Sequence, residues 1–358
     1  MKIIKVPFKE VEDFVPEDFG GIRNRKTVCI VRYGAFGDII QASSLFPRFK
    51  EQGYQVCVNV TEIGAGMLKH NPDVDQLIVQ KDNQINNFKL KDYWEKMSEC
   101  FDRFVQLSES VEGRLLLNPE RDVEVDGKKV RVKATKGYYS SKDEVHELCD
   151  KNYLEETHRI ADIEFKHSPI FYPSPMDKDW AKKQRRKIKT RHLILWSLSG
   201  SSVHKVYPWT DNVIAALLLK TRDLSIMTVG DHLCQLLEVG WEKEKRVILK
   251  SGKLPIGKTL ALLPHCDIVV GPETGVLNAA SMLPNHKCVF LSHSSNENLT
   301  KHWKNTTAFE PEDCPCFPCH KLHFGFSTCN RDEESGGALC AANIKPDRVV
   351  DDIMRNLK

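Results

Sequence analysis

Short apolar runs alternate with helix-length segments through both halves of the chain. Strands of parallel sheets are buried on both faces, so they read as continuous apolar runs, and helices connect them. The pattern therefore predicts an α/β fold with parallel sheets. The expected strands are 27–33, 55–60, 76–79 and 103–107 in the first half and 192–198, 224–230, 246–250, 267–271 and 287–292 in the second.

The region between the two sets of strands is less regular. Asp126 and Gly127 form a dipeptide that favours a tight two-residue turn, so residues 123–136 are expected to form a hairpin. Residues 177–189 read as a helix that ends in a cationic run, and a linker precedes it over 171–177. Apolar residues at helical spacing, with a proline in the first turn, predict a terminal helix over 346–358.

The chain is too long, at 358 residues, for one ordinary core, so we expect two domains, 1–176 and 177–345, followed by the terminal helix. Its 41% hydrophobic and 28% charged residues are typical of a soluble globular protein, and a net charge of +3 does not by itself indicate a nucleic-acid or membrane partner. Acidic residues interrupt the N-terminal segment where a signal peptide needs an apolar core. We therefore expect a cytoplasmic protein without a transmembrane segment.

Glycine-rich turns join a strand to a helix at two places. RYGAFGD, residues 32–38, ends in an aspartate, and GPETGVLNAAS, residues 271–281, follows a strand in the second half. Free backbone amides at such a helix start can bind phosphate, although glycine-rich turns are also common as plain connections. Lys205 in KVYPW is expected on a loop at the same carboxyl edge of the sheet, where a lysine is either solvated or neutralises a diphosphate.

Four motifs together, RYGAFGD, NPDVDQLIV, KVYPW and GPETGVLNAAS, resemble glycosyltransferase family 9, the heptosyltransferases that add ADP-heptose to the lipopolysaccharide core. The resemblance extends over most of 27–357 and is thin from 110 to 175. It implies a GT-B fold of two facing Rossmann-like domains, with the acceptor bound by the first and the nucleotide sugar by the second. It also implies that the terminal helix crosses back to pack on the first domain, and that the protein is an inverting glycosyltransferase.

The resemblance also assigns roles to residues. Asp38 matches the catalytic base that takes the proton of the attacking hydroxyl, although an aspartate at this position also serves as a helix cap. Gly34 and Gly37 would keep the backbone low enough for the acceptor substrate to approach. The residues expected at the diphosphate of the nucleoside-diphosphate sugar donor are Ser199, Gly200, Ser201, Lys205, Thr274 and Gly275. Glu273 is expected to accept hydrogen bonds from the ribose or another polar group of the donor.

Several features depart from the family pattern. Glu273 stands where the family usually has aspartate, Ser44 replaces a proline, Asn278 replaces a frequent histidine, and residues 1–26 precede the first strand. These changes leave the base and the sugar of the donor open. DVD at 73–75 has the spacing of metal-binding carboxylates, but it lies in a connection of the resembling family, so we expect sugar transfer without a catalytic metal.

Five of the twelve cysteines crowd into residues 314–340. In a reducing compartment this crowding indicates a metal rather than disulfides, and a close CxxC pair with two later cysteines suits structural zinc or iron. Similar cysteines occur in relatives of the family that bind iron, and the alternative is a loop of reduced cysteines. The expected ligands are Cys316, Cys319, Cys329 and Cys340, with Cys314, His320 and His323 as possible substitutes.

Positive charge is concentrated in two segments, 128–136 and 182–192. Such runs are usually solvated faces, but they could also receive an anionic acceptor. A phosphorylated lipopolysaccharide core, DNA with hydroxylated bases or a protein would qualify as that acceptor. Two other functions stay open, a sugar-nucleotide epimerase on the same architecture and a non-catalytic module for binding or assembly.

Overall fold

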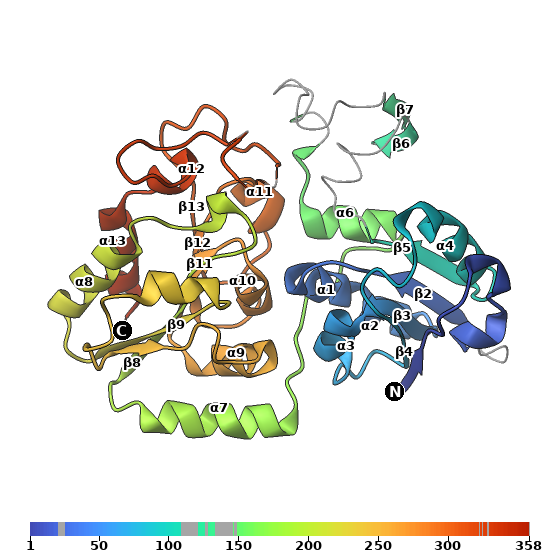
Figure 1. Ribbon diagram of the computed structural model, residues 1–358, viewed down its shortest axis with the longest axis horizontal. Coiled ribbons are helices and arrows are strands. Elements are labelled where there is room, and N and C mark those ends of the chain that lie inside the picture. The colour runs from blue at the N-terminus through green and yellow to red at the C-terminus, as the bar shows by residue number, and fades with distance from the viewer. Residues whose placement is uncertain are drawn as a thin grey trace. The chain divides into compact units, whose positions relative to one another are not determined.

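The structure is a computed structural model that describes residues 1–20, 26–108, 121–125, 128–132, 146, 149–321, 323, 325–327 and 329–357. Its contacts divide the chain into two compact units, whose elements are labelled in Figure 1. One unit comprises Met1–Arg114 and Tyr153–Tyr172, and the other comprises Leu115–Asn152 and Pro173–Lys358. The second unit thus includes residues 115–152, which we had expected in the first domain, and its main segment begins within the predicted linker.

The first unit is built on a five-stranded sheet in which every pairing is parallel. The four strands expected here are confirmed to within two residues at each end. The first three are buried runs, whereas the fourth, Arg103–Gln106, is only partly buried. In spatial order the strands are β1 (Lys2–Lys5), β4 (Gln76–Gln80), β3 (Gln55–Thr61), β2 (Thr27–Val31) and β5 (Arg103–Gln106). The helices are η1 (Val11–Asp13), η2 (Pro16–Phe19), α1 (Phe36–Ala42), η3 (Ser43–Leu45), α2 (Phe46–Glu51), α3 (Glu62–Leu68), η4 (Asn87–Lys89), α4 (Leu90–Ser98) and α6 (Tyr153–Ile160).

The N-terminal segment completes the core of this unit. Strand β1 adds an edge strand beside β4, and the segment that follows it covers one face of the sheet. The rings of Phe14 and Phe19 lie 5.2 and 5.6 Å from that of Tyr93 on α4, in edge-to-face contact. These contacts give residues 1–20 a structural role that the family resemblance did not supply.

The second unit is built on a six-stranded sheet that is also parallel throughout. Its order is β10 (Val247–Leu249), β9 (Leu224–Val229), β8 (His192–Ser197), β11 (Ile268–Pro272), β12 (His286–Phe290) and β13 (Thr306–Phe309). The order reverses between β8 and β11, and ligands of open α/β sheets bind at the carboxyl edge of such a switch point. The helices are α7 (Pro175–Lys187), η7 (Val203–Lys205), α8 (Thr210–Lys220), η8 (Leu233–Glu238), α9 (Ile256–Leu262), η9 (Leu263–His265), α10 (Gly275–Ala280), α11 (Asn296–Leu299), α12 (Leu339–Ala342) and α13 (Pro346–Asn356).

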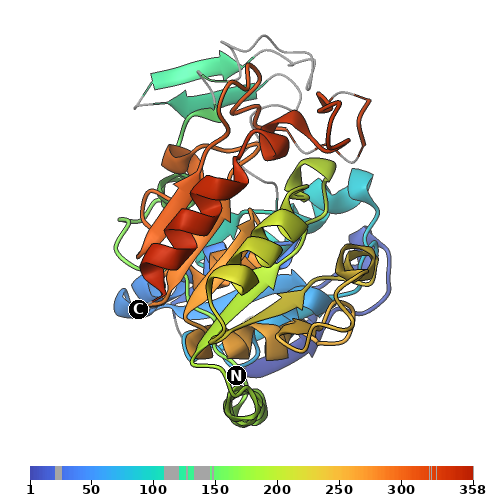
Figure 2. The same ribbon diagram turned by 90° about the vertical axis from the view of Figure 1, so that its left-hand side faces the viewer.

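The terminal helix α13 packs within the second unit. Figure 2 shows α13 beside α8 over the sheet, and the two helices are in contact. Val349 and Ile353 of α13 are fully buried in one apolar cluster with Trp196 of β8. The apolar face of this helix therefore fills the core of the second unit, and its expected packing on the first domain stays a prediction.

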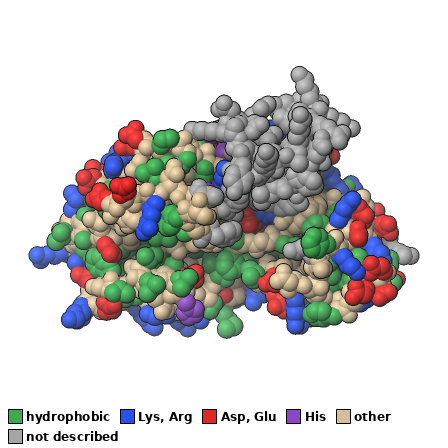
Figure 3. All heavy atoms as spheres, turned by 45° about the horizontal axis from the view of Figure 1, so that its top comes forward, with side chains coloured by type: hydrophobic (Ala, Val, Ile, Leu, Met, Phe, Trp, Pro, Cys, Tyr) green, Lys and Arg blue, Asp and Glu red, His purple; other side chains and the backbone are tan. Residues whose placement is uncertain are grey.

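Two elements bear on the predicted basic segments. An antiparallel hairpin of β6 (Arg121–Val125) and β7 (Lys128–Val132) is present, and its turn lies outside the described residues. Helix α7 buries Ala181 and packs on α9, while Lys182, Lys183, Arg186 and Lys187 are exposed. On the face seen in Figure 3, basic and acidic side chains are interspersed. None of the helices that the structure describes is long and apolar enough to cross a membrane.

Candidate functional site

Asp38 lies in the first turn of α1, just beyond the carboxyl end of β2. The chain passes from strand to helix through Gly34, whose φ of +116° is one that residues with a side chain rarely adopt. A Cβ atom at Gly34 would also lie 2.8 Å from Oδ2 of Asp38. Glycine is therefore required at this turn to make room for the aspartate.

Three groups hold the Asp38 carboxylate. Its Oδ2 accepts a hydrogen bond of 3.1 Å from the backbone N–H of Ala35, the N-cap residue, so Asp38 caps the helix from its third position rather than from the N-cap. Its Oδ1 lies 2.6 Å from Nη2 of Arg32, which also donates through Nη1 to the carbonyl of Leu107. The side chain of Asp38 is nevertheless 36% exposed, so an oxygen lone pair stays open to a ligand. We had not expected Arg32 to pair with Asp38, although a cationic residue directly after the strand could have indicated it.

The second glycine turn lies between β11 and α10. A Cβ atom at Gly271 would lie 2.6 Å from the carbonyl oxygen of Ser197, so only glycine allows these two strands to approach so closely. Thr274 is the N-cap residue of α10 and places its hydroxyl 3.2 Å from that of Ser197. The turn is thereby fixed against the end of β8.

The loop after β8 meets this turn. A Cβ atom at Gly200 would lie 2.7 Å from Cδ of Lys205 and 3.3 Å from Cγ2 of Thr274. These three residues, expected from sequence to share one ligand, are therefore neighbours at the carboxyl edge of the sheet. Ser199 lies beside them with its hydroxyl 3.1 Å from Sγ of Cys234, while Ser201 is exposed.

Glu273 differs from this group because its carboxylate is already bonded within the protein. The residue is 5% exposed, and Oε1 accepts a 2.6 Å hydrogen bond from the backbone N–H of Ser292. Oε2 accepts from the hydroxyl of Ser294 at 2.5 Å and lies 2.6 Å from Nδ1 of His293. The structure therefore gives Glu273 an anchoring position, which ties the α10 turn to the segment after β12, rather than an orientation toward a donor.

Burial and charge shift the pKa of Glu273 in opposite directions. Burial alone would raise the pKa of this carboxyl, but the charge of His293 and the hydrogen bonds that it receives outweigh that effect and lower the pKa below its usual value. Next to this pair, burial lowers the pKa of His204 to about 2, with a further contribution from the charge of His293. The ring of His204 lies between those of His293 and His323, at centroid distances of 5.1 and 5.6 Å. A row of buried imidazoles thus runs from Glu273 toward the cysteine-rich loop.

The cysteine-rich loop brings its thiols into one region. Burial, together with the nearby thiol of Cys316, raises the pKa of Cys319 to about 12 and that of Cys329 to about 11. The Sγ atoms of Cys314 and Cys316 are 3.6 Å apart, and Sγ of Cys319 is 3.7 Å from Nε2 of His323. Soft thiol donors grouped in this way fit zinc or iron, which would favour their deprotonation.

Within the described residues, two groups of three or more potential ligands have all their ligand atoms within 4.8 Å of one another, and neither group includes these thiols. One group is His146, Asp150 and His320, and the other is His286, Cys288 and Asp352. His320, expected from sequence as a possible substitute ligand of the cysteine site, is therefore bonded to Asp150 instead. Its Nε2 lies 2.8 Å from Oδ1 of that aspartate.

Comparison with solved structures identifies the fold. ADP-heptose lipopolysaccharide heptosyltransferase II of E. coli is 14% identical with a TM-score of 0.62, covering 92% of this chain and 98% of that one. A family 9 glycosyltransferase from Veillonella parvula is 12% identical with a TM-score of 0.65, covering 93% of this chain and 97% of that one. TibC, an iron-containing dodecameric glycosyltransferase from enterotoxigenic E. coli, is 12% identical with a TM-score of 0.56, covering 94% and 77% respectively.

These similarities are visible only in structure. No family model matches the chain, and no curated protein sequence matches it. At such low identities the similarity establishes the fold alone, and it confirms the prediction of a GT-B, heptosyltransferase-like architecture with two parallel sheets.

Proposed function

We propose that this protein is an inverting glycosyltransferase that moves a sugar from a nucleoside-diphosphate sugar to an acceptor hydroxyl. The observation that carries the proposal is the meeting of Gly200, Lys205 and Thr274 at the switch point of the second sheet. The heptosyltransferase-like fold supports it, since the solved neighbours include an ADP-heptose lipopolysaccharide heptosyltransferase.

Lys205 and the turn at Thr274 hold the donor diphosphate in this proposal. The lysine ammonium neutralises phosphate charge, and the backbone N–H groups of Thr274 and Gly275 donate hydrogen bonds to phosphate oxygens. The hydroxyls of Ser199 and Ser201 add neutral contacts. These groups stabilise the charge that develops on the nucleoside diphosphate as it leaves. Glu273 acts indirectly, by fixing the turn that carries those amides.

Asp38 acts as the base. The acceptor oxygen attacks the anomeric carbon while the bond from that carbon to the diphosphate breaks, and the acceptor proton passes to the Asp38 carboxylate. A single displacement of this kind inverts the configuration at the anomeric carbon. Arg32 keeps the carboxylate oriented through the 2.6 Å ion pair and balances its charge before the proton arrives.

The cysteine-rich loop has a structural role in this proposal. Cys316, Cys319, Cys329 and Cys340 would hold zinc or iron, and the ion would fix the loop that carries His323 next to His204 and Lys205. TibC, which is described as iron-containing, shares the fold. Sugar transfer itself uses Lys205, backbone amides and Asp38. The acceptor is anionic, and the exposed cations of α7 are the candidate contacts for it.

A ligand-stabilisation experiment tests the donor site. Thermal unfolding of the full chain is followed with nucleoside diphosphates and their sugars, for the wild type, Lys205→Ala and the exposed control Lys243→Ala. A ligand that binds the folded state raises its stability. We expect one nucleotide class to stabilise the wild type and the control but not Lys205→Ala. Equal stabilisation of all three proteins, or of none, would contradict the proposed donor site.

A further inference from the structure

A second cluster of metal-ligating side chains lies outside the donor site, where β12 meets the terminal helix. His286 and Cys288 are two residues apart on β12 and so point to the same face of the sheet. Thr307 of β13 is the registered neighbour of Cys288, and Asp352 of α13 packs over both strands. The three potential ligand atoms, from His286, Cys288 and Asp352, all lie within 4.8 Å of one another.

Oδ2 of Asp352 is the point on which these atoms converge. It lies 2.7 Å from Nε2 of His286 and 3.3 Å from Sγ of Cys288. Tetrahedral zinc holds nitrogen and oxygen ligands at about 2.0 Å and sulfur at about 2.3 Å, which places neighbouring ligand atoms about 3.3 to 3.5 Å apart. The nitrogen and oxygen would therefore need to separate by only about 0.6 Å, and sulfur and oxygen by less, to admit an ion.

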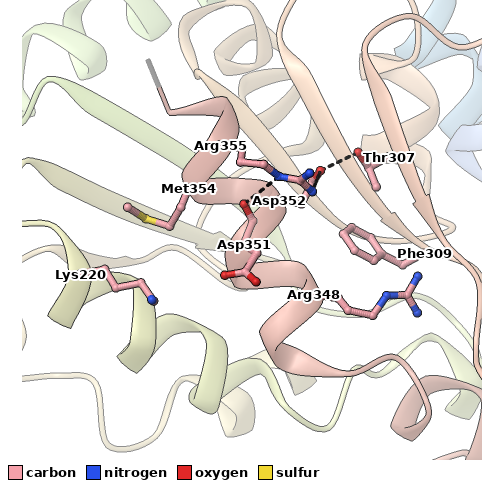
Figure 4. Close-up of a pocket in the computed structure, with 8 residues that line it drawn as sticks. All are labelled: Lys220, Thr307, Phe309, Arg348, Asp351, Asp352, Met354 and Arg355. Atoms are coloured by element: carbon pink, nitrogen blue, oxygen red, sulfur yellow. Dashed lines mark hydrogen bonds and ion pairs between the residues drawn. The ribbon is translucent and has the colours of Figure 1, made fainter.

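The other oxygen of Asp352 is held by a separate contact. Thr307 donates to Oδ1 at 2.9 Å, and Nη2 of Arg355 lies 3.5 Å from the same oxygen, which leaves Oδ2 directed at the cluster. A dashed line in Figure 4 marks the contact between Thr307 and Asp352. Second contacts of this kind orient carboxylate ligands in metal sites. Thr307 and Asp352 also line an open pocket of about 830 Å³, shown in Figure 4, so one ligand residue of the cluster borders solvent-accessible space.

The nitrogen of His286 has more polar neighbours than it can satisfy. Nε2 lies 2.7 Å from Asp352, 3.4 Å from the hydroxyl of Thr307 and 3.3 Å from Nδ2 of Asn356. An imidazole nitrogen offers either one proton or one lone pair, so it cannot bond to all three. A cation that takes the lone pair would remove this conflict, because Thr307 and Asn356 also donate elsewhere, to Oδ1 and to the carbonyl of Asp352.

We propose that His286, Cys288 and Asp352 form a binding site for a divalent transition-metal ion, with zinc as the best match. The mixed nitrogen, sulfur and oxygen set suits zinc and excludes magnesium and calcium, which prefer oxygen ligands. Binding exchanges the thiol proton of Cys288 for the metal, and that proton leaves to solvent. With three protein ligands, the fourth position of a tetrahedral ion would be left for water. The ion joins α13 to β12 and is separate from any ion in the cysteine-rich loop.

Cobalt titration tests the site, because a thiolate bound to Co²⁺ gives a charge-transfer absorption. The full chain is stripped with a chelator and titrated with Co²⁺ and then Zn²⁺, in a Cys316→Ser/Cys319→Ser background that disables the loop. We expect one equivalent to bind with the thiolate signature. His286→Gln should weaken binding more than 100-fold, and Cys288→Ser should abolish the signature. The control His265→Gln should leave both unchanged.

A milder variant covers the case in which these core substitutions impair folding. Thr307→Val keeps the shape and all three ligands and removes the hydroxyl that contacts Oδ1 of Asp352 and Nε2 of His286, so it should weaken metal binding about 10- to 100-fold. When the loop cysteines are left intact, the site should appear as one bound metal equivalent, and the single substitution Thr307→Val should weaken the binding of that equivalent. No cobalt binding in the loop variant and the wild type, or equal affinity in His265→Gln, Thr307→Val and His286→Gln, would overturn the proposal.

Discussion

Removal of the Glu273 carboxylate should destabilise the second unit. In Glu273→Ala the backbone N–H of Ser292, the hydroxyl of Ser294 and the ring of His293 lose a buried partner. Breaking a buried pair by removing one member typically costs about 3 to 5 kcal/mol, because the remaining groups stay desolvated without a partner. In a unit of this size that loss lowers the unfolding temperature by about 10 °C.

The pH dependence follows from the lowered pKa of Glu273. A carboxyl with a lower pKa in the folded state contributes stability that is complete above its unfolded pKa, near the ordinary value of 4.5, and declines as pH falls below it. Glu273→Gln keeps the shape but cannot titrate. We therefore expect the difference in stability between wild type and Glu273→Gln to be constant above about pH 5 and to shrink at lower pH.

Chemical denaturation of the full chain, followed by circular dichroism from pH 3 to pH 8, measures both effects. Glu62→Gln is a matched control, because that glutamate is exposed in the first turn of α3. A Glu273→Ala protein with the stability of the wild type would refute the anchoring role. If its donor affinity were then selectively lost, Glu273 would bind the donor directly, as its position in the sequence motif first indicated.

Three further predictions concern single residues. Gly200→Ala places a methyl group 2.7 Å from Cδ of Lys205, so it should weaken nucleotide binding about 10-fold in a thermal-shift titration while changing stability by less than about 1 kcal/mol. Arg32→Gln removes the ion pair that orients Asp38, so steady-state kinetics should show kcat reduced about 100-fold with an unchanged KM for the donor. Burial lowers the pKa of Lys287 to about 8, so the folded state gains up to about 3 kcal/mol relative to the unfolded chain as pH rises from 8 to 10.5. Denaturation of Lys287→Met across this range should lack that gain, and an identical pH profile for mutant and wild type would contradict the assignment.

The sequence predicted elements whose apolar pattern is strong. Strand β2 is an unbroken buried run, and every strand expected in the second half is present at nearly the predicted position. Strand β1 was missed because its residues KIIK are mostly exposed and carry no strand pattern. Strand β13, TTAF, is short and only partly buried, and it was missed for the same reason.

Side-chain partners were harder to predict than elements. The motifs placed Gly200, Lys205 and Thr274 at one sheet edge, and the structure brings them together there. The partner of Glu273 comes from residues 292–294, which nothing in the glycine motif connects to it. The packing of α13 could not be read from its amphipathic pattern either, because a pattern shows that a face is buried but not what buries it.

Release of nucleoside diphosphate from a panel of sugar nucleotides is the most direct measurement of the central claim. A glycosyltransferase without its acceptor slowly transfers the sugar to water, and this step needs the same base. We expect the wild type to release the diphosphate of one donor class, and Asp38→Asn to release it at least 100-fold more slowly while the donor still stabilises the mutant. No release from any donor, or equal release by Asp38→Asn, would contradict the account.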